Sequence, residues 1–253
     1  MLQSANKMSE LALGAHDGRI GHVEEFYFDD THWTIRYLVA QAGNWLTGRM
    51  VLLSPHVLGK PDEHEKVLPV RLTQDQIRHC PSPESDRPLS RRFEEEYYKY
   101  FGWPHYWTGP YLWGPSPLPV IPSAGLEGPF NMSERMRPDF PKGDPHLRST
   151  KEVAGYHIRA QDGEIGHVED FLYDDKDWSI RYLVVDTRNW WPGKKVLVPP
   201  SWIGEIRWED RSLDADVVRE DIRQAPAYDA SKPITLGFEM QLARYYEADL
   251  HRV

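Results

Sequence analysis

Two histidine–glutamate pairs have the residue types and the spacing that a metal site or a proton relay would need. His22 is followed two residues later by Glu24, and His167 is followed by Glu169. Residues i and i+2 of a strand share a face, so each pair could bind a metal ion or relay a proton. A structural zinc site needs four ligands, and no third or fourth ligand stands at a recognisable spacing. We therefore expect both pairs to be polar residues of a structural strand, with no metal and no cofactor.

Further carboxylates gather in two acidic segments. Asp29-Asp30, and Asp174-Asp175 with Asp177, supply oxygen atoms of the kind that calcium prefers. A calcium site needs about six or more ligands, whereas aspartates commonly hydrogen-bond the backbone of tight turns, so we predict hairpin turns. Glu24 and Glu25 are neighbours in a predicted strand and point to opposite faces. They therefore cannot converge on one substrate as a general acid/base pair.

Arg36 and Arg181 stand in otherwise apolar strands. We predict that each forms a structural ion pair with a nearby carboxylate, such as one on the preceding strand. Cys80 is the single cysteine, and it precedes a proline in a predicted loop. The sequence contains no nucleophile elbow, no dinucleotide-binding glycine motif and no phosphate-binding lysine loop. We recognise no catalytic residues and predict that the protein is not an enzyme.

The elements that must position these residues occur twice. DGRIGHVEEFYFDD at residues 17–30 returns as DGEIGHVEDFLYDD at residues 162–175. Adding 145 to any residue number between 17 and 59 gives its partner, and more than half of the paired positions are identical. The chain is therefore an internal duplication, in which the same fold is expected twice.

Within each copy, runs of β-branched and aromatic residues separated by tight turns predict short strands. In the second copy these runs are 156–161, 165–173, 178–187, 195–198, 202–208 and 211–216, followed by a short helix at 219–224. An amphipathic helix closes each copy. Its apolar stripe is Leu89, Phe93, Tyr97 and Tyr100 in the first copy and Ile234, Phe238, Leu242 and Tyr245 in the second. So many short strands cannot bury a core as a flat sheet, so we predict a mainly β protein of two small antiparallel barrels in tandem.

Three segments follow from this pattern. Residues 1–101 form barrel domain 1 with its trailing helix, residues 102–154 form a connector, and residues 155–253 form barrel domain 2 with its trailing helix. Equivalent tryptophans, Trp33 with Trp178 and Trp45 with Trp190, are expected in the two cores.

The connector is dense in proline and glycine, which prevents a regular hydrogen-bonded ladder, and it is unusually aromatic. Tryptophan and tyrosine are enriched at protein interfaces. The candidate partner-binding residues are Trp103, Tyr106, Trp107, Tyr111 and Trp113. The alternative that stays open is that the connector wraps over the barrels and seals an internal interface.

The repeated DG turn, the GHVE strand, the acidic DD turn, the IRYLV strand and the stop VLVPPSWI resemble the PRC-barrel family. That family is named for the cytoplasmic domain of the photosynthetic reaction-centre H subunit and also includes a domain of the ribosome maturation factor. The resemblance covers both repeats and omits the connector. It implies small β-barrels that act as adaptors and, since the H subunit's membrane helix is absent, a stand-alone tandem protein of bacterial type.

Charge and composition limit the functions that remain. A net charge of −9 argues against extended nucleic-acid binding. No apolar run reaches the roughly 18–20 residues that cross a bilayer, and no secretory signal is present, which leaves peripheral membrane association open. The lone cysteine fits a reducing cytoplasm. We expect a soluble protein whose two repeats form a pseudo-twofold pair, and a homodimer stays open.

Three functions stay under consideration. The first is a non-catalytic adaptor or scaffold that binds a protein partner through the tandem domains. The second is a small-ligand or metal-sensing module with its site between the two barrels. The third is an accessory factor in ribosome or RNA metabolism, by analogy with the maturation factor.

Overall fold

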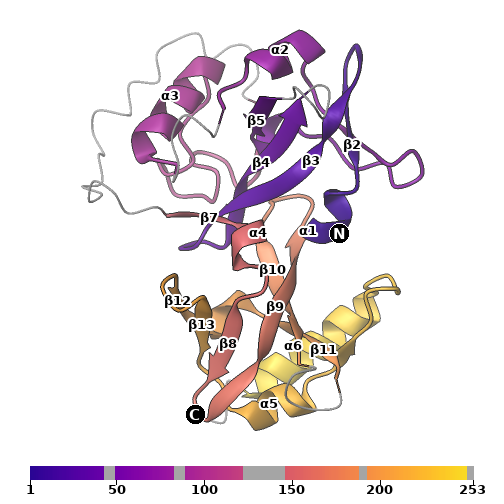
Figure 1. Ribbon diagram of the computed structural model, residues 1–253, viewed down its shortest axis with the longest axis vertical. Helices are drawn as coiled ribbons and strands as arrows, with labels where there is room; N and C mark the ends of the chain where they lie inside the picture. Colours follow the sequence, from indigo (N-terminus) through magenta and orange to yellow (C-terminus); the bar gives the residue numbers. More distant parts are fainter. Residues whose placement is uncertain (43–48, 83–88, 122–145, 188–192, 250–253) are drawn as a thin grey trace. The chain divides into compact units, whose positions relative to one another are not determined.

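The computed structural model describes residues 1–42, 49–82, 89–121, 146–187 and 193–249. They fall into two compact units (Figure 1). Unit 1 comprises Met1, Gln3–Ser149 and Asp174–Ser179, and unit 2 comprises Leu2, Thr150–Tyr173 and Ile180–Val253. Of the expected connector, residues 150–154 belong to unit 2, whereas the described residues 102–121 and 146–149 belong to unit 1. So does the turn at Asp174–Ser179, although it lies within the second repeat.

Unit 1 is built around one sheet with the strand order β5-β4-β3-β2-β6, and β7 pairs with β3. Figure 1 shows β3, β4 and β5 side by side in this unit. Its elements are α1 (Ala5–Met8), β2 (Ala12–Ala15), β3 (Gly18–Asp29), β4 (Thr34–Ala42), β5 (Arg49–Leu53), η1 (Pro55–Val57), β6 (Val67–Pro69), α2 (Gln74–His79), α3 (Arg91–Phe101) and β7 (Leu147–Ser149).

Unit 2 repeats this plan in a sheet with the order β12-β13-β8-β9-β10-β11-β14, and β1 (Leu2–Ser4) pairs with β9. Its elements are α4 (Thr150–Val153), β8 (His157–Ala160), β9 (Gly163–Asp174), β10 (Ile180–Asp186), β11 (Lys195–Val198), η3 (Pro200–Trp202), β12 (Ile203–Arg207), β13 (Ser212–Ala215), α5 (Arg219–Gln224), β14 (Ala227–Tyr228) and α6 (Leu236–Asp249).

The strand register is repeated with the same offset of 145. Phe26 pairs with Leu38 in unit 1, and Phe171 pairs with Leu183 in unit 2. Each sheet also contains a parallel pair, β2 with β6 and β8 with β13, beside antiparallel ladders such as β3 with β4 and β9 with β10. The prediction of a mainly β protein is confirmed. The sequence predicts only antiparallel strands, and its local pattern does not indicate the parallel pairs. Closure of each sheet into a barrel stays a prediction.

The repeated glycine of the GHV segment has a steric cause. Gly21 has φ +103°, and a Cβ placed there would lie 1.8 Å from the carbonyl oxygen of Gln41 on the neighbouring strand. Gly166 has φ +138°, and its Cβ would lie 2.1 Å from the carbonyl oxygen of Asp186. Glycine alone combines this backbone conformation with so close an approach. The two long strands β3 and β9 therefore need glycine at the same point.

The helices confirm part of the predicted pattern. Thr73 begins α2 with a capping box, in which Thr73 and Gln76 each accept a hydrogen bond from the other's backbone N–H. The apolar stripe predicted for α3 includes Tyr100, and this part of the prediction is wrong because Tyr100 is exposed. The helix instead buries Glu94, Tyr97 and Tyr98. In α6, Tyr246 is buried more deeply than the predicted Tyr245.

The tryptophans predicted to lie in the two cores differ in burial. Trp178 is buried, as predicted, whereas Trp33 is half-buried and stacks on Phe28 with ring centroids 5.4 Å apart. Trp45 and Trp190 lie outside the described residues. None of the described helices combines the length and the apolar character that crossing a membrane requires.

Candidate functional site

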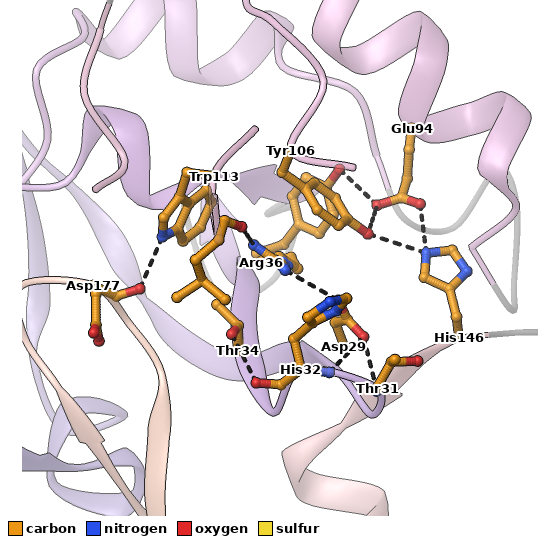
Figure 2. A network of polar contacts seen from close by, with 12 residues as sticks. Asp29, Thr31, His32, Thr34, Arg36, Glu94, Tyr106, Trp113, His146 and Asp177 are labelled. Atoms are coloured by element: carbon orange, nitrogen blue, oxygen red, sulfur yellow. Dashed lines mark hydrogen bonds and ion pairs between the residues drawn. The ribbon is translucent and has the colours of Figure 1, made fainter. Parts of the chain in front are cut away.

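The Arg36 cluster is a group of buried polar and aromatic side chains in unit 1, shown in Figure 2. We define it as Asp29, Arg36, Glu94, Tyr106, Trp113 and His146. Asp29 ends β3, Arg36 is the third residue of β4, and Glu94 lies in the first turn of α3. Tyr106, Trp113 and His146 come from the chain between α3 and β7.

Asp29 ends β3 and organises the turn that follows. Its Oδ1 accepts hydrogen bonds from the backbone N–H groups of Thr31, at 2.9 Å, and His32, at 3.2 Å. Its Oδ2 lies 3.0 Å from Nδ1 of His32 and 3.0 Å from Nη2 of Arg36. In the second repeat, Asp174 likewise accepts from the N–H of Lys176 at 2.9 Å. The acidic segments are therefore hairpin turns, as predicted, and the Arg36–Asp29 ion pair confirms the pairing expected for this arginine.

Arg36 is only 1% exposed, and its guanidinium has both polar and aromatic partners. Its Nη1 donates to the carbonyl oxygen of Leu112 at 2.6 Å, while Nη2 donates to Asp29. The guanidinium carbon lies 3.9 Å from the ring centroid of Tyr106 and 4.9 Å from that of Trp113. A buried guanidinium needs a carboxylate as its counter-charge and hydrogen-bond acceptors for its remaining N–H groups. The connector supplies one such acceptor, the carbonyl oxygen of Leu112, and two aromatic rings.

Glu94 is a second polar centre, on α3, and is fully buried. Its Oε1 accepts hydrogen bonds from the hydroxyls of Tyr37 and Tyr106, each at 3.0 Å. Its Oε2 lies 3.0 Å from Nη1 of Arg91 and 2.7 Å from Nε2 of His146. Because Tyr106 touches both Arg36 and Glu94, it joins the two ion-paired centres into one network.

An aromatic layer adjoins this network. His56 stacks on Trp103 with centroids 4.8 Å apart and meets Trp113 edge-on at 5.2 Å. Its Nδ1 lies 2.9 Å from Oγ of Ser54. Burial, assisted by the positive charge of Arg36 and Arg71, lowers the pKa of His56 to about 3. This histidine is therefore a neutral packing residue at ordinary pH.

Burial and charge also set the protonation of the network itself. For Asp29, burial raises the pKa, but the hydrogen bond from His32 and the charges of Arg36 and His32 outweigh it, and the pKa ends well below its usual range. Burial and the charge of Glu94 raise the pKa of Tyr37 and of Tyr106. Asp29 is thus an anion, while both tyrosines stay protonated and donate hydrogen bonds to Glu94.

The five predicted connector residues separate by burial. Trp113 is 1% exposed and its Nε1 donates to the carbonyl oxygen of Asp177 at 2.8 Å, and Tyr106 is 4% exposed. Trp103 and Trp107 are half-buried, and the latter lies 4.0 Å from the guanidinium of Arg91. Tyr111 is 54% exposed. The structure thus brings four of the five against unit 1, as the alternative of an internally packed connector requires, and leaves Tyr111 at the surface.

The histidine–glutamate pairs are not equivalent in the structure. His22 lies 2.7 Å from Glu24 at the surface, whereas Glu169 pairs with Lys195 at 2.5 Å. In unit 2 the exposed pair is His157 with Glu164, at 2.7 Å. Among the described residues no group of three or more histidine, cysteine or acidic side chains is arranged to hold a metal ion.

Two members of the Arg36 cluster, Glu94 and His146, were missed from the sequence, and so was His56 of the adjoining aromatic layer. Glu94 did carry a signal, because it recurs as Glu239 beside the apolar stripe of the second closing helix. His146 and His56 carried none, since Glu94, which His146 contacts, and the tryptophans around His56 are distant in sequence. The assembled site is closed: Arg36, Asp29 and Glu94 are each 5% exposed or less and already ion-paired within the described residues. Such an arrangement holds chain segments together and presents no reactive group to a substrate.

In a comparison with known protein families, residues 148–222 match the model of the PRC-barrel domain. A comparison with curated proteins finds no match to the chain.

Proposed function

The chain carries a PRC-barrel domain at residues 148–222, and from that premise we propose that it is a non-catalytic adaptor that binds a protein partner. We propose further that unit 1 is a second PRC-barrel domain. The repeated sequence supports this, as do the shared element order and the shared strand register, including the parallel pair.

The observation that carries the proposal is a run of exposed apolar side chains just after the buried Trp113. Leu118, Val120 and Ile121 are 41%, 51% and 43% exposed, and Tyr111 precedes them. Isolated surface apolar residues are ordinary, but several within one short segment are typical of an interaction site. The Arg36 cluster holds the preceding residues against unit 1, so less conformational entropy is lost when a partner binds this segment. We define Tyr111, Leu118, Val120 and Ile121 as the connector surface.

A cytoplasmic location belongs to the same proposal, since one buried cysteine suits a reducing compartment. Peripheral attachment to a membrane-bound complex is compatible with it, because an adaptor needs only a protein partner there.

The test is affinity capture from the native cell with the whole chain as bait. The variant Leu118→Ser/Val120→Ser/Ile121→Ser should retain at least about ten-fold less of the partner, which corresponds to a loss of about 1.4 kcal/mol. The matched control is Tyr100→Ser, which removes an aromatic ring of similar exposure from α3. Unchanged circular dichroism melting would show that both variants fold.

Each outcome decides something. Selective loss in the triple variant supports an adaptor that works through the connector surface. Equal retention by all three proteins, or retention of nothing by the wild type, overturns it. Retention of ribosomes at moderate salt would replace the proposal with the accessory function in ribosome metabolism.

A further inference from the structure

The connector surface lies in a long stretch of the chain without charged side chains. No aspartate, glutamate, lysine or arginine occurs between Lys99 and Glu127, although these residue types make up 27% of the chain. Burial lowers the pKa of His105, so this histidine of the same stretch is neutral at ordinary pH as well. A charged group of a partner would be desolvated against this surface without a counter-charge, which is unfavourable. The partner that fits the connector surface is therefore uncharged where the two touch.

A short turn fixes the shape of this surface. The N–H of Val120 donates to the carbonyl oxygen of Leu118 at 2.9 Å, which closes a γ-turn over Pro119. Pro119 is buried, whereas Leu118 and Val120 on either side of it are 41% and 51% exposed. The turn is thus anchored through its proline and presents two aliphatic side chains to solvent. Because the turn exists before binding, little further ordering is needed when a partner covers it.

The backbone of this segment has few hydrogen-bond donors to offer. Three of the seven residues from 115 to 121 are prolines, which have no backbone N–H. The N–H of Leu118 donates to Oγ of Ser116 at 3.2 Å, and that of Val120 is used in the turn. Acceptors remain, because within the ranges that the structure describes no hydrogen bond reaches the carbonyl oxygens of the exposed Pro115 and Pro117. The segment is therefore rich in acceptors and poor in donors.

This pattern of donors and acceptors disfavours two common kinds of partner. Addition to a partner's β-sheet needs N–H groups along one edge of the strand, and alternate residues of a strand share an edge. The prolines at 115, 117 and 119 leave one edge without donors, and two N–H groups of the other edge are already used. A bilayer provides no donor in its hydrocarbon core, so it would leave the carbonyl groups of an irregular segment unsatisfied. A protein groove that combines apolar surface with hydrogen-bond donors meets both requirements.

We infer that the connector surface docks into a groove of the partner protein that is lined by tryptophan or tyrosine side chains. The inference rests on the proposed adaptor function and names the chemistry of the partner at the same surface. Tryptophan and tyrosine join a large apolar face to a single donor at the ring edge. The faces pack on Leu118, Val120 and the exposed prolines, while an indole N–H or a phenol hydroxyl donates to the carbonyl oxygens of Pro115 and Pro117. Aromatic-lined grooves are a common means of binding proline-rich segments.

Indole is the probe, because it carries the face and the donor of a tryptophan without the rest of a partner. Full-length protein with isotope-labelled isoleucine, leucine and valine methyl groups is titrated with indole and followed by NMR. We expect saturable shifts of the methyl signals of Leu118 and Val120. The control within the same molecule is Leu236, which is 72% exposed at the start of α6, a helix whose carbonyl groups accept from its own backbone. Its methyl signals should not shift saturably over the same range.

The donor and the prolines are tested separately. N-methylindole has a similar ring but no N–H, and it should bind at least about two-fold more weakly, the lower end of what one hydrogen bond contributes. Pro117→Ala should also weaken indole binding at least about two-fold, because alanine removes a ring from the surface and frees the backbone. The matched control is Pro233→Ala, a change at an exposed proline before α6 that should leave the binding unchanged. Both prolines are exposed, so neither substitution should disturb folding.

Equal binding of the two indoles would show that no hydrogen bond contributes, and it would overturn the inference. Shifts at Leu236 as large as those at Leu118 would overturn it too, as would the absence of saturable binding. Sedimentation with phosphatidylcholine vesicles tests the alternative of a lipid surface, and we expect the protein to stay in the supernatant. Co-sedimentation that the variant Leu118→Ser/Val120→Ser/Ile121→Ser abolishes would replace the aromatic groove with a membrane.

These measurements need no partner from the cell, so their failure is distinct from failure of the adaptor proposal. If indole does not bind while the capture experiment succeeds, the adaptor stands and its partner holds the connector surface by other contacts. If indole binds selectively while the capture experiment fails, the adaptor and its partner groove are rejected together.

Discussion

The guanidinium of Arg36 lies against the ring of Tyr106, with its central carbon 3.9 Å from the ring centroid, and the hydroxyl of the same tyrosine donates to Glu94. One side chain of the connector thereby contacts a buried cation with its face and a buried anion with its edge. Removing either charge would leave the other part of the network without its compensation, which makes the attachment of the connector sensitive to single substitutions.

Arg36→Met should destabilise unit 1 by about 3–5 kcal/mol, because it leaves the Asp29 carboxylate buried without its main counter-charge. It also removes the donor to Leu112, so the amides of residues 103–116 should exchange faster in hydrogen-exchange mass spectrometry. The matched control is Arg181→Met, the exposed equivalent, which should change stability by no more than about 0.5 kcal/mol. Equal effects of the two substitutions would show that the Arg36 cluster does not hold the connector.

Acid should weaken unit 1 through His56. Burial, with the charges of Arg36 and Arg71, lowers the folded-state pKa of His56 from 6.5 to about 3, so the unfolded chain binds this proton first as the pH falls. The stabilisation from the neutral ring is complete above pH 6.5 and is lost as the pH drops toward 3, at about 1.4 kcal/mol per pH unit. Urea denaturation between pH 6.5 and pH 5 measures this slope.

The comparison for that slope is His56→Gln, whose side chain can still hydrogen-bond Ser54 but does not titrate. Between pH 6.5 and pH 5, the free energy of unfolding of this variant should fall less steeply than that of the wild type, by about 1.4 kcal/mol per pH unit. A substitution at the exposed His64, His64→Gln, should keep the wild-type slope. Parallel slopes for all three proteins would assign the acid sensitivity to other groups.

Trp178→Ala should cost roughly 3–5 kcal/mol of unfolding free energy, since the ring is 5% exposed and its removal leaves a cavity. The carbonyl oxygen of Trp178, which accepts from the N–H of Ile35 at 2.9 Å, is unaffected by the change. Trp33→Ala, at the equivalent half-buried position, should cost less than half as much. Urea denaturation followed by circular dichroism measures both, and an unchanged midpoint for Trp178→Ala would show that this ring is not a core residue.

Cys80 should resist modification while unit 1 is folded. Burial raises the pKa of its thiol to about 12, and only the thiolate reacts with disulfide reagents. At pH 8 we expect reaction with a chromogenic disulfide at least about 100-fold more slowly in buffer than in denaturant. Similar rates in the two conditions would mean that the residues around α2 open readily.

Local pattern was sufficient for most of the fold. β11 (Lys195–Val198) and α5 (Arg219–Gln224) begin and end at the predicted residues, because Pro199 stops the strand and the proline at 226 follows the helix. The parallel pairs β2–β6 and β8–β13 join residues far apart in the chain, and no local pattern reports such a pairing.

The site was harder to predict for a related reason. Apolar spacing alone predicts Tyr100 facing inward on α3, but the helix buries Glu94, which pairs with Arg91 of the same helix and lies 2.7 Å from Nε2 of His146, beyond residue 145. A buried carboxylate is recognisable only once its cationic partners are known. The repeat of Glu94 as Glu239 was the available hint, and alone it did not distinguish a buried position from an exposed one.

The turn at Asp174–Ser179 has a consequence for how the protein is made. Trp113 donates to Asp177, and Ile35 donates to Trp178, so unit 1 receives two of its hydrogen bonds from residues encoded more than 60 positions downstream. A ribosome that has synthesised only the first repeat and the connector has not yet delivered those residues. The first half of this duplicated chain therefore completes its structure only after much of the second half has emerged, and cutting the gene between the repeats would yield a first half that lacks part of itself.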